Sequence, residues 1–148
     1  MTASDEITLS GRCLCGAVEI AVRPETAELH ACHCEMCRRW TGSAFVEVDV
    51  RPDDLTVSGP VRSHASSDWA ERAWCDTCDS TLWYRLTLEG HERYAVSAGL
   101  FDDAGGLSLA KEIFIDAKPG GYAFAGARET KTRAEMEAIF ASLSEGAA

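Results

Sequence analysis

The stretch Cys32-His33-Cys34-Glu35-Met36-Cys37-Arg38-Arg39 places three thiols within six residues and two cations directly after them. Thiolates bind zinc strongly, and a structural zinc normally takes four protein ligands, whereas a catalytic zinc takes three and keeps its fourth position open. The stretch alone leaves two interpretations, an open catalytic site and a structural site that a residue elsewhere completes. The histidines that could complete it are His30, His33, His64 and His91.

The other four cysteines form two pairs, Cys13-x-Cys15 and Cys75-x₂-Cys78. Seven thiols therefore divide into four and three, the numbers for one closed structural zinc and one open catalytic zinc. Other divisions are possible, but each would share the six-residue stretch between two metals. The sequence thus predicts two zinc ions per chain. The structural one would bind Cys13, Cys15, Cys75 and Cys78, and the catalytic one Cys32, Cys34 and Cys37.

Length and composition are typical of a single globular domain spanning residues 1–148, because 46% of the chain is hydrophobic. An odd number of cysteines argues against a disulfide framework. No apolar run is long enough to span a membrane, and the polar start Met1–Glu6 does not resemble a signal peptide. We therefore expect a cytoplasmic protein. A formal charge of −10 disfavours nucleic acid and acidic membrane surfaces as partners. The oligomeric state is left open.

Alternating apolar residues and turn signals predict a mainly β fold. The cleanest predicted strand covers residues 44–50, with Val46, Val48 and Val50 on one face and Glu47 and Asp49 on the other. Further strands are expected over residues 17–22, 55–57, 61–66, 81–85, 93–98 and 111–115.

Two helices are expected. The spacing of Cys34 and Cys37 suits a knuckle or the first turn of a short helix, which ends at Thr41-Gly42-Ser43. Trp40 is expected to pack in the core. A longer C-terminal helix is indicated by a capping box between Thr132 and Glu135. Its apolar stripe should pack against the domain, and consists of Met136, Ile139, Phe140 and Leu143.

Three motifs together resemble the glutathione-dependent formaldehyde-activating enzymes, a family that includes the centromere protein V domain. The motifs are Gly11-Arg12-Cys13-Leu14-Cys15-Gly16-Ala17-Val18, Cys32-His33-Cys34 through Cys37-Arg38-Arg39 with Gly42, and Trp74-Cys75-Asp76-Thr77-Cys78. The resemblance covers roughly residues 10–120. It implies several coiled antiparallel β-sheets, similar to the methionine-R-sulfoxide reductase architecture, and the same four-plus-three division of zinc ligands. The chain departs from the family pattern at Asp79, where glycine is usual, and at Gly120-Gly121-Tyr122, where tryptophan is common.

The resemblance also implies a carbon–sulfur lyase that acts on a thiol adduct such as S-hydroxymethylglutathione, formed from glutathione and formaldehyde or a related small aldehyde. In this interpretation the zinc on Cys32, Cys34 and Cys37 takes a small thiol at its open position, and Arg38 and Arg39 offset charge or clamp a substrate carboxylate. Two alternatives stay open. One is a non-enzymatic two-zinc module that binds a protein or peptide, and the other is a thiol redox enzyme.

Overall fold

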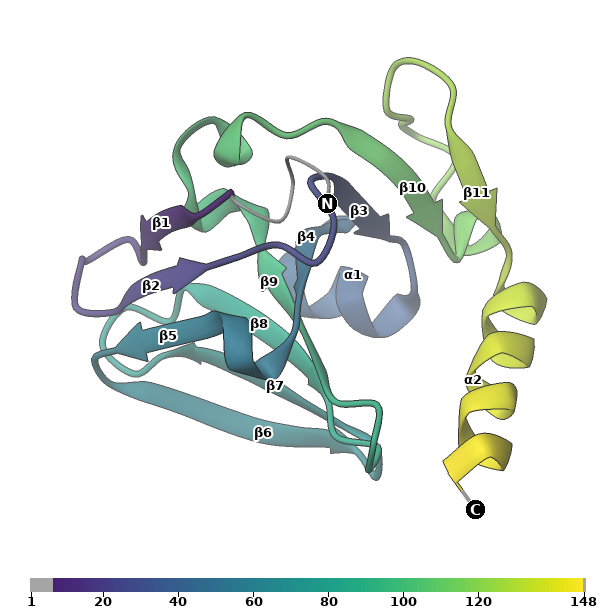
Figure 1. The fold of residues 1–148 in the computed structure, drawn as a ribbon. Coiled ribbons are helices and arrows are strands. Elements are labelled where there is room, and N and C mark those ends of the chain that lie inside the picture. Colours follow the sequence, from purple (N-terminus) through teal and green to yellow (C-terminus); the bar gives the residue numbers. More distant parts are fainter. Residues whose placement is uncertain (1–6, 148) are drawn as a thin grey trace.

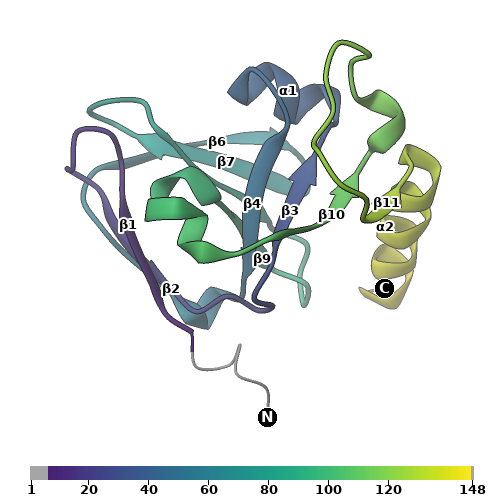
Figure 2. The same cartoon turned by 90° about the horizontal axis from the view of Figure 1, so that it is seen from above.

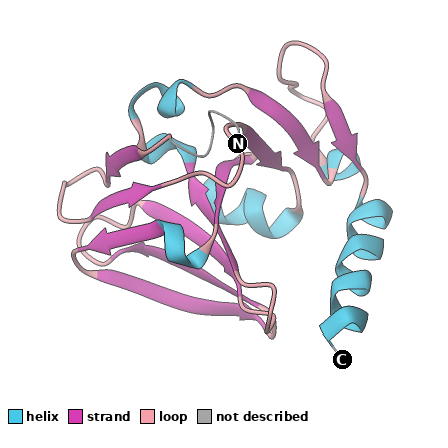
Figure 3. Ribbon diagram, in the orientation of Figure 1, coloured by secondary structure: helices cyan, strands magenta, loops and turns pink. Residues whose placement is uncertain are grey.

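The computed structural model describes residues 7–147, so the polar start Met1–Glu6 lies outside the described residues. The chain forms two sheets and two helices (Figures 1 and 3). The strands are β1 (Leu9–Arg12), β2 (Glu19–Val22), β3 (Leu29–Cys32), β4 (Phe45–Val50), β5 (Leu55–Ser58), β6 (Val61–Ser67), β7 (Ala70–Cys75), β8 (Thr81–Leu86), β9 (Arg93–Ser97), β10 (Leu109–Ile113) and β11 (Glu129–Lys131). The helices are α1 (Glu35–Thr41) and α2 (Arg133–Ala147). Short 3-10 turns occupy Pro52–Asp54, Ala98–Leu100, Asp102–Gly106 and Ile115–Ala117.

The main core lies between the two sheets. The small antiparallel sheet has the order β1-β2-β5, and the large sheet has the order β11-β10-β3-β4-β9-β8-β7-β6. Ile20 and Val22 of β2, and Val18 just before the strand, belong to this core. The large sheet contributes Val48 and Val50 of β4, Val96 of β9 and Leu82 of β8. Figure 2 shows the small sheet at one end of the molecule and α2 at the other.

The mainly β class and the C-terminal helix are confirmed, while the large sheet is mixed rather than wholly antiparallel. Strand β10 pairs in parallel with both β3 and β11, and the remaining pairings are antiparallel. Parallel neighbours need long connections instead of hairpins, and β3 and β10 are far apart in the chain. The sequence pattern does not reveal β1, β3 or β11 as strands.

The opposite face of the large sheet is covered as well. Val48 and Val50 enter the main core, and Glu47, on the other face of β4, is only 6% exposed. A second apolar cluster on this side contains Cys32, Cys37 and Phe45, with Trp40 packed against it. A charged side chain in an alternating strand normally indicates solvent, so this burial was not predictable from β4 alone.

Helix α1 begins and ends where the sequence predicts. The Cys34 sulfur accepts a hydrogen bond from the Cys37 amide and so caps the N-terminus, and Gly42, with φ +94°, closes the C-terminus. A left-handed φ favours glycine, which explains the abrupt stop. Trp40 packs against Phe45, with ring centroids 5.2 Å apart, but remains half-buried.

Helix α2 forms the expected capping box but packs more loosely than predicted. The Thr132 amide donates to the Glu135 carboxylate and the Glu135 amide donates to the Thr132 hydroxyl. Its stripe is only partly buried, because Ile139 is 44% exposed and the ring of Phe140 packs at 5.4 Å from that of Trp69, which is itself exposed. Neither described helix is long and apolar enough to cross a membrane.

Candidate functional site

The structure brings together the four cysteines assigned to a closed site. Cys13 and Cys15 lie between β1 and β2, and Cys75 and Cys78 lie at the turn between β7 and β8. One ligand atom from each lies within 4.8 Å of all the others. The Cys13 and Cys15 sulfurs are 3.6 Å apart, and those of Cys15 and Cys75 are 3.9 Å apart. Such a set of four thiols fits a tetrahedral zinc.

Backbone amides surround these four sulfurs. The Val18 amide donates to Cys13, the Ala17 amide to Cys15, and the amides of Thr77 and Cys78 both donate to Cys75, at 3.3 to 3.5 Å. Hydrogen bonds to sulfur favour the thiolate form, which is the form that binds metal. The bond between the Cys78 sulfur and the Ser80 hydroxyl, 3.1 Å, lowers the pKa of Cys78 to about 5.

The three remaining cysteines meet at the junction of β3 and α1. Cys32 is the last residue of β3, Cys34 caps α1, and Cys37 lies in its first turn. Their sulfurs fall within 4.8 Å of one another, and no histidine, carboxylate or fourth cysteine of the described chain joins this group. Hydrogen bonds from the Cys32 and Cys37 thiols lower the pKa of Cys34 to about 2, and the same hydrogen bonds raise the pKa of Cys32. The group is therefore a preformed three-thiol site in which Cys34 carries negative charge most readily.

Arg72 of β7 is the counter-charge of this site, and the sequence did not indicate it. The side chain is 7% exposed, and its Nη1 donates to the Cys37 sulfur at 3.6 Å. The guanidinium lies 4.9 Å from the Trp40 ring centroid and 5.1 Å from that of Tyr84. No carboxylate of the described residues forms an ion pair with it. A buried cation without an anion is very unfavourable, so the arrangement fits an anionic cysteine group.

The two arginines that follow Cys37 differ in their surroundings. Arg39 has a side chain 72% exposed and forms an i,i+4 ion pair with Glu35 at 3.8 Å, so it faces solvent. Arg38 is half-buried, and its Nε is buried without a hydrogen-bond partner in the described chain. It follows Cys34 by four residues and so shares a face of α1 with that thiol. The geometry therefore separates the predicted pair, with Arg38 partly inside the molecule and Arg39 in solvent.

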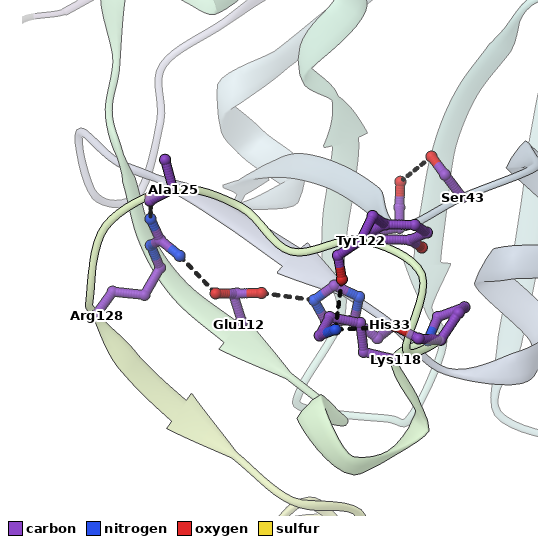
Figure 4. Close-up of polar contacts among 9 residues, drawn as sticks. His33, Ser43, Glu112, Lys118, Tyr122, Ala125 and Arg128 are labelled. Atoms are coloured by element: carbon purple, nitrogen blue, oxygen red, sulfur yellow. Dashed lines mark hydrogen bonds and ion pairs between the residues drawn. The ribbon is translucent and has the colours of Figure 1, made fainter.

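His33 is buried and paired, so it does not face solvent. Its Nε2 lies 2.7 Å from Glu112 Oε1, and Arg128 Nη1 lies 2.5 Å from Glu112 Oε2 (Figure 4). Burial raises the pKa of Glu112, but the hydrogen bonds from His33 and Arg128 outweigh that effect and lower it. Arg128 also donates to the Ala125 carbonyl. This network fixes the backbone between Cys32 and Cys34 and ties it to the segment before β11.

The segment that covers His33 includes Tyr122, one of the positions at which the sequence departs from the family pattern. Lys118 Nζ donates to the carbonyls of Pro119, at 2.9 Å, and Tyr122, at 2.5 Å, and Figure 4 shows these groups beside His33. The ring of Phe124 lies 6.0 Å from that of His33. Tyr122 and Phe124 remain partly exposed, so this segment presents aromatic surface near the β3–α1 junction.

A third group of side chains of the kinds that bind metals was not identified from the sequence. His30, Glu47 and Asp49 lie together on β3 and β4, with His30 Nδ1 3.1 Å from Asp49 and Nε2 3.1 Å from Glu28. The hydrogen bond to Asp49 raises the pKa of His30, and burial with the nearby Asp49 raises that of Glu47. The signal that could have found it is the i,i+2 carboxylate pair opposite a histidine in the next strand.

Two hollows of the described residues bear on the site. The larger of the two, about 520 Å³, lies over the small sheet between Arg12, Glu19 and Thr56, and no cysteine lines it. The smaller, about 320 Å³, is lined by Trp40, Trp74, Asp79 and Thr81. Only the smaller one adjoins the three-cysteine group, because Trp40 packs directly against it.

Comparison with known proteins agrees with this geometry. A family model described as glutathione-dependent formaldehyde-activating enzyme matches residues 8–117. An uncharacterized lyase of Schizosaccharomyces pombe is 34% identical over 116 residues, which cover 78% of this chain and 84% of that protein. The crystal structure of a Rhodobacter sphaeroides protein superposes with a TM-score of 0.55 at 24% identity, covering 69% of this chain and all of the other, which supports the same fold.

Proposed function

We propose that this chain, which belongs to the glutathione-dependent formaldehyde-activating enzyme family, is a zinc-dependent carbon–sulfur lyase acting on the adduct of a small thiol and a small aldehyde. S-Hydroxymethylglutathione is the substrate we assign. In the cleavage direction the carbon–sulfur bond breaks and its electron pair stays on sulfur. The adduct's hydroxyl group loses its proton to water as the aldehyde carbonyl forms.

The observation that carries this proposal is the buried contact between Arg72 and Cys37. A three-thiolate zinc group has a net charge of −1, and Arg72 balances that charge in the interior. Trp40 and Tyr84 hold the guanidinium in place by stacking on it. Because no described side chain supplies a fourth ligand, the site is suited to accept a sulfur atom from substrate.

The residues of the three-cysteine site and those around it would have different roles in the reaction. Cys32, Cys34 and Cys37 would hold the zinc, and zinc bound there lowers the pKa of a coordinating thiol enough to ionise it near neutral pH. Arg72 favours the extra negative charge that arrives with the substrate sulfur. The His33–Glu112–Arg128 network keeps the two cysteines beside His33 in position. Arg38, half-buried on the same helix, would bind a carboxylate of the thiol substrate.

The rest of the proposal concerns the whole chain. The four-cysteine group would hold a second, structural zinc, and residues 1–148 would form one domain. We propose that the protein acts in the cytoplasm on a small thiol, without nucleic acid or a membrane as partner. The net charge of −10 supports this choice of partner.

The test follows exchange between ¹³C-formaldehyde and S-hydroxymethylglutathione by NMR exchange spectroscopy, with zinc-loaded protein. The exchange should accelerate well above its rate in buffer. Arg38→Ala should weaken the apparent affinity for glutathione about tenfold, since a charge-assisted hydrogen bond is lost. Arg39→Ala, which removes an equal charge from the exposed side of the same helix, should leave it unchanged.

The alternatives give different outcomes in the same samples. Unchanged exchange in protein that carries both zinc ions would contradict the lyase and favour the binding module. Consumption of glutathione to its disulfide without formaldehyde would favour a thiol redox enzyme instead. Equal effects of Arg38→Ala and Arg39→Ala would remove Arg38 as the carboxylate clamp.

A further inference from the structure

We infer that the recess between Trp40 and Trp74 binds the ammonium group of the thiol substrate, with the Asp79 carboxylate as its counter-ion. This inference rests on the proposed function, because it takes a small thiol as the molecule that reaches the three-cysteine group. It deepens that function by naming the residues that would recognise the positively charged amino group of such a thiol.

The lining of the recess has the chemistry that an alkylammonium group requires. Two indole rings, from the end of α1 and from β7, form walls of a hollow of about 320 Å³. The faces of indoles attract cations more strongly than those of other aromatic side chains. The Thr81 hydroxyl adds a hydrogen-bond acceptor. A carboxylate beside aromatic walls thus selects a cation over a neutral group of the same size.

Asp79 is an exposed residue that lines the recess, and its backbone is fixed in the turn. Its φ of +64° is left-handed, and its amide donates to the Cys75 carbonyl at 2.9 Å within the turn between β7 and β8. Among the described residues, no cation lies within ion-pair distance of its carboxylate. Asp76, three residues earlier in the same turn, is instead paired with Arg62 at 3.5 Å. The turn therefore offers one occupied and one available carboxylate.

The recess adjoins the three-cysteine group, because Trp40 borders both. Trp40 packs against the cluster of Cys32, Cys37 and Phe45, and the same residue lines the recess. Arg72 also lies over Trp40, but its charge is balanced by the cysteine group that it contacts. An ammonium group bound beside Asp79 would therefore not be repelled by an unbalanced positive charge on Arg72.

The experiment uses S-methylglutathione, whose blocked sulfur cannot ionise, and the same molecule acetylated on its amino group. Each is titrated into the zinc-loaded protein, with the indole N–H signals of Trp40 and Trp74 as the readout. The amine should bind about five- to tenfold more tightly than the acetylated form, the range expected for one such contact. Asp79→Asn should reduce this preference to about twofold or less, and Asp76→Asn should keep it.

Asp79→Gly provides a second variant, because glycine readily adopts the φ of this position and the turn should remain folded. It should lose the preference as Asp79→Asn does. Equal affinity for both ligands in the unaltered protein would overturn the inference, as would signal changes confined to Trp69 and Trp83. Discrimination at Asp79 with no formaldehyde exchange would refute the lyase but leave the ammonium site standing.

Discussion

The two cysteine groups consist of the same ligand atoms but differ in what surrounds them. The four-cysteine group is bordered by backbone amides and the Ser80 hydroxyl, and Cys15 within it is exposed. The three-cysteine group lies inside the molecule beside Arg72. Amides come with any tight turn, whereas a buried arginine must be held by other side chains. This difference supports the proposal that the first group serves the fold and the second serves the reaction.

Their positions in the chain differ as well. Cys15 and Cys75 are separated by 60 residues, so a metal held by the four-cysteine group joins the β1–β2 connection to the β7–β8 turn. The other three cysteines fall within six residues, and a metal there closes almost no loop. Closing a long loop restricts the unfolded chain far more than closing a short one. Loss of the two groups should therefore have unequal consequences.

The largest effect is expected for Cys78→Ser. This change removes one of four ligands, and the binding free energy of a structural zinc is directly free energy of folding. Soluble yield should collapse, and any recovered protein should melt at least about 15 °C lower with one zinc fewer. Differential scanning calorimetry and elemental analysis provide the measurements. A variant that kept its melting temperature would show that the four-cysteine group does not hold the fold.

Cys37→Ser should preserve the fold but abolish the activity. The zinc content should fall from two ions per chain to one, and formaldehyde exchange should drop to the rate in buffer. The melting temperature should change by only a few degrees, since little loop closure is lost. The same elemental and calorimetric measurements apply. If this variant collapsed as Cys78→Ser does, both groups would be structural and the comparison would fail.

The smallest effect concerns Glu47, which lies on the same sheet face as the three-cysteine group. Burial and the neighbouring Asp49 raise its pKa well above 4.5, so the folded protein holds the proton more tightly than the unfolded chain. Its contribution to stability is complete below pH 4.5 and is lost as pH rises through the folded pKa. Glu47→Gln, which resembles the protonated form, should raise the melting temperature by a few degrees at pH 8 and leave it unchanged near pH 4.

Thermal melting across this pH range is the measurement for Glu47. Glu19→Gln is the control, because Glu19 is exposed on β2 and loses no solvation on folding. It should give the same melting temperature as the unaltered protein at both pH values. A Glu47→Gln variant less stable at pH 8 would mean that the carboxylate is ionised and paired in the interior.

Local patterns were sufficient for the features that depend on residues near one another in the chain. The spacing of Cys32, Cys34 and Cys37 predicted one ligand group, and Gly42 and the Thr132–Glu135 box predicted where helices end or begin. Each of these depends on one turn of backbone, whose geometry is set by a few dihedral angles. These features could therefore be predicted without knowledge of the fold.

Contacts between strands that are distant in the chain could not be predicted from such local patterns. Arg72 precedes the second cysteine turn like any surface charge, and only the pairing of β7 with β8 and the covering helix α1 place it against Cys37, Trp40 and Tyr84. Glu47 became buried for the same reason, since its strand lies between β3 and β9 under that helix. Burial of a charge depends on what covers it, and the covering residues come from elsewhere in the chain. The cysteine groups were therefore evident from short stretches, but the buried charge beside one of them was decided by tertiary packing.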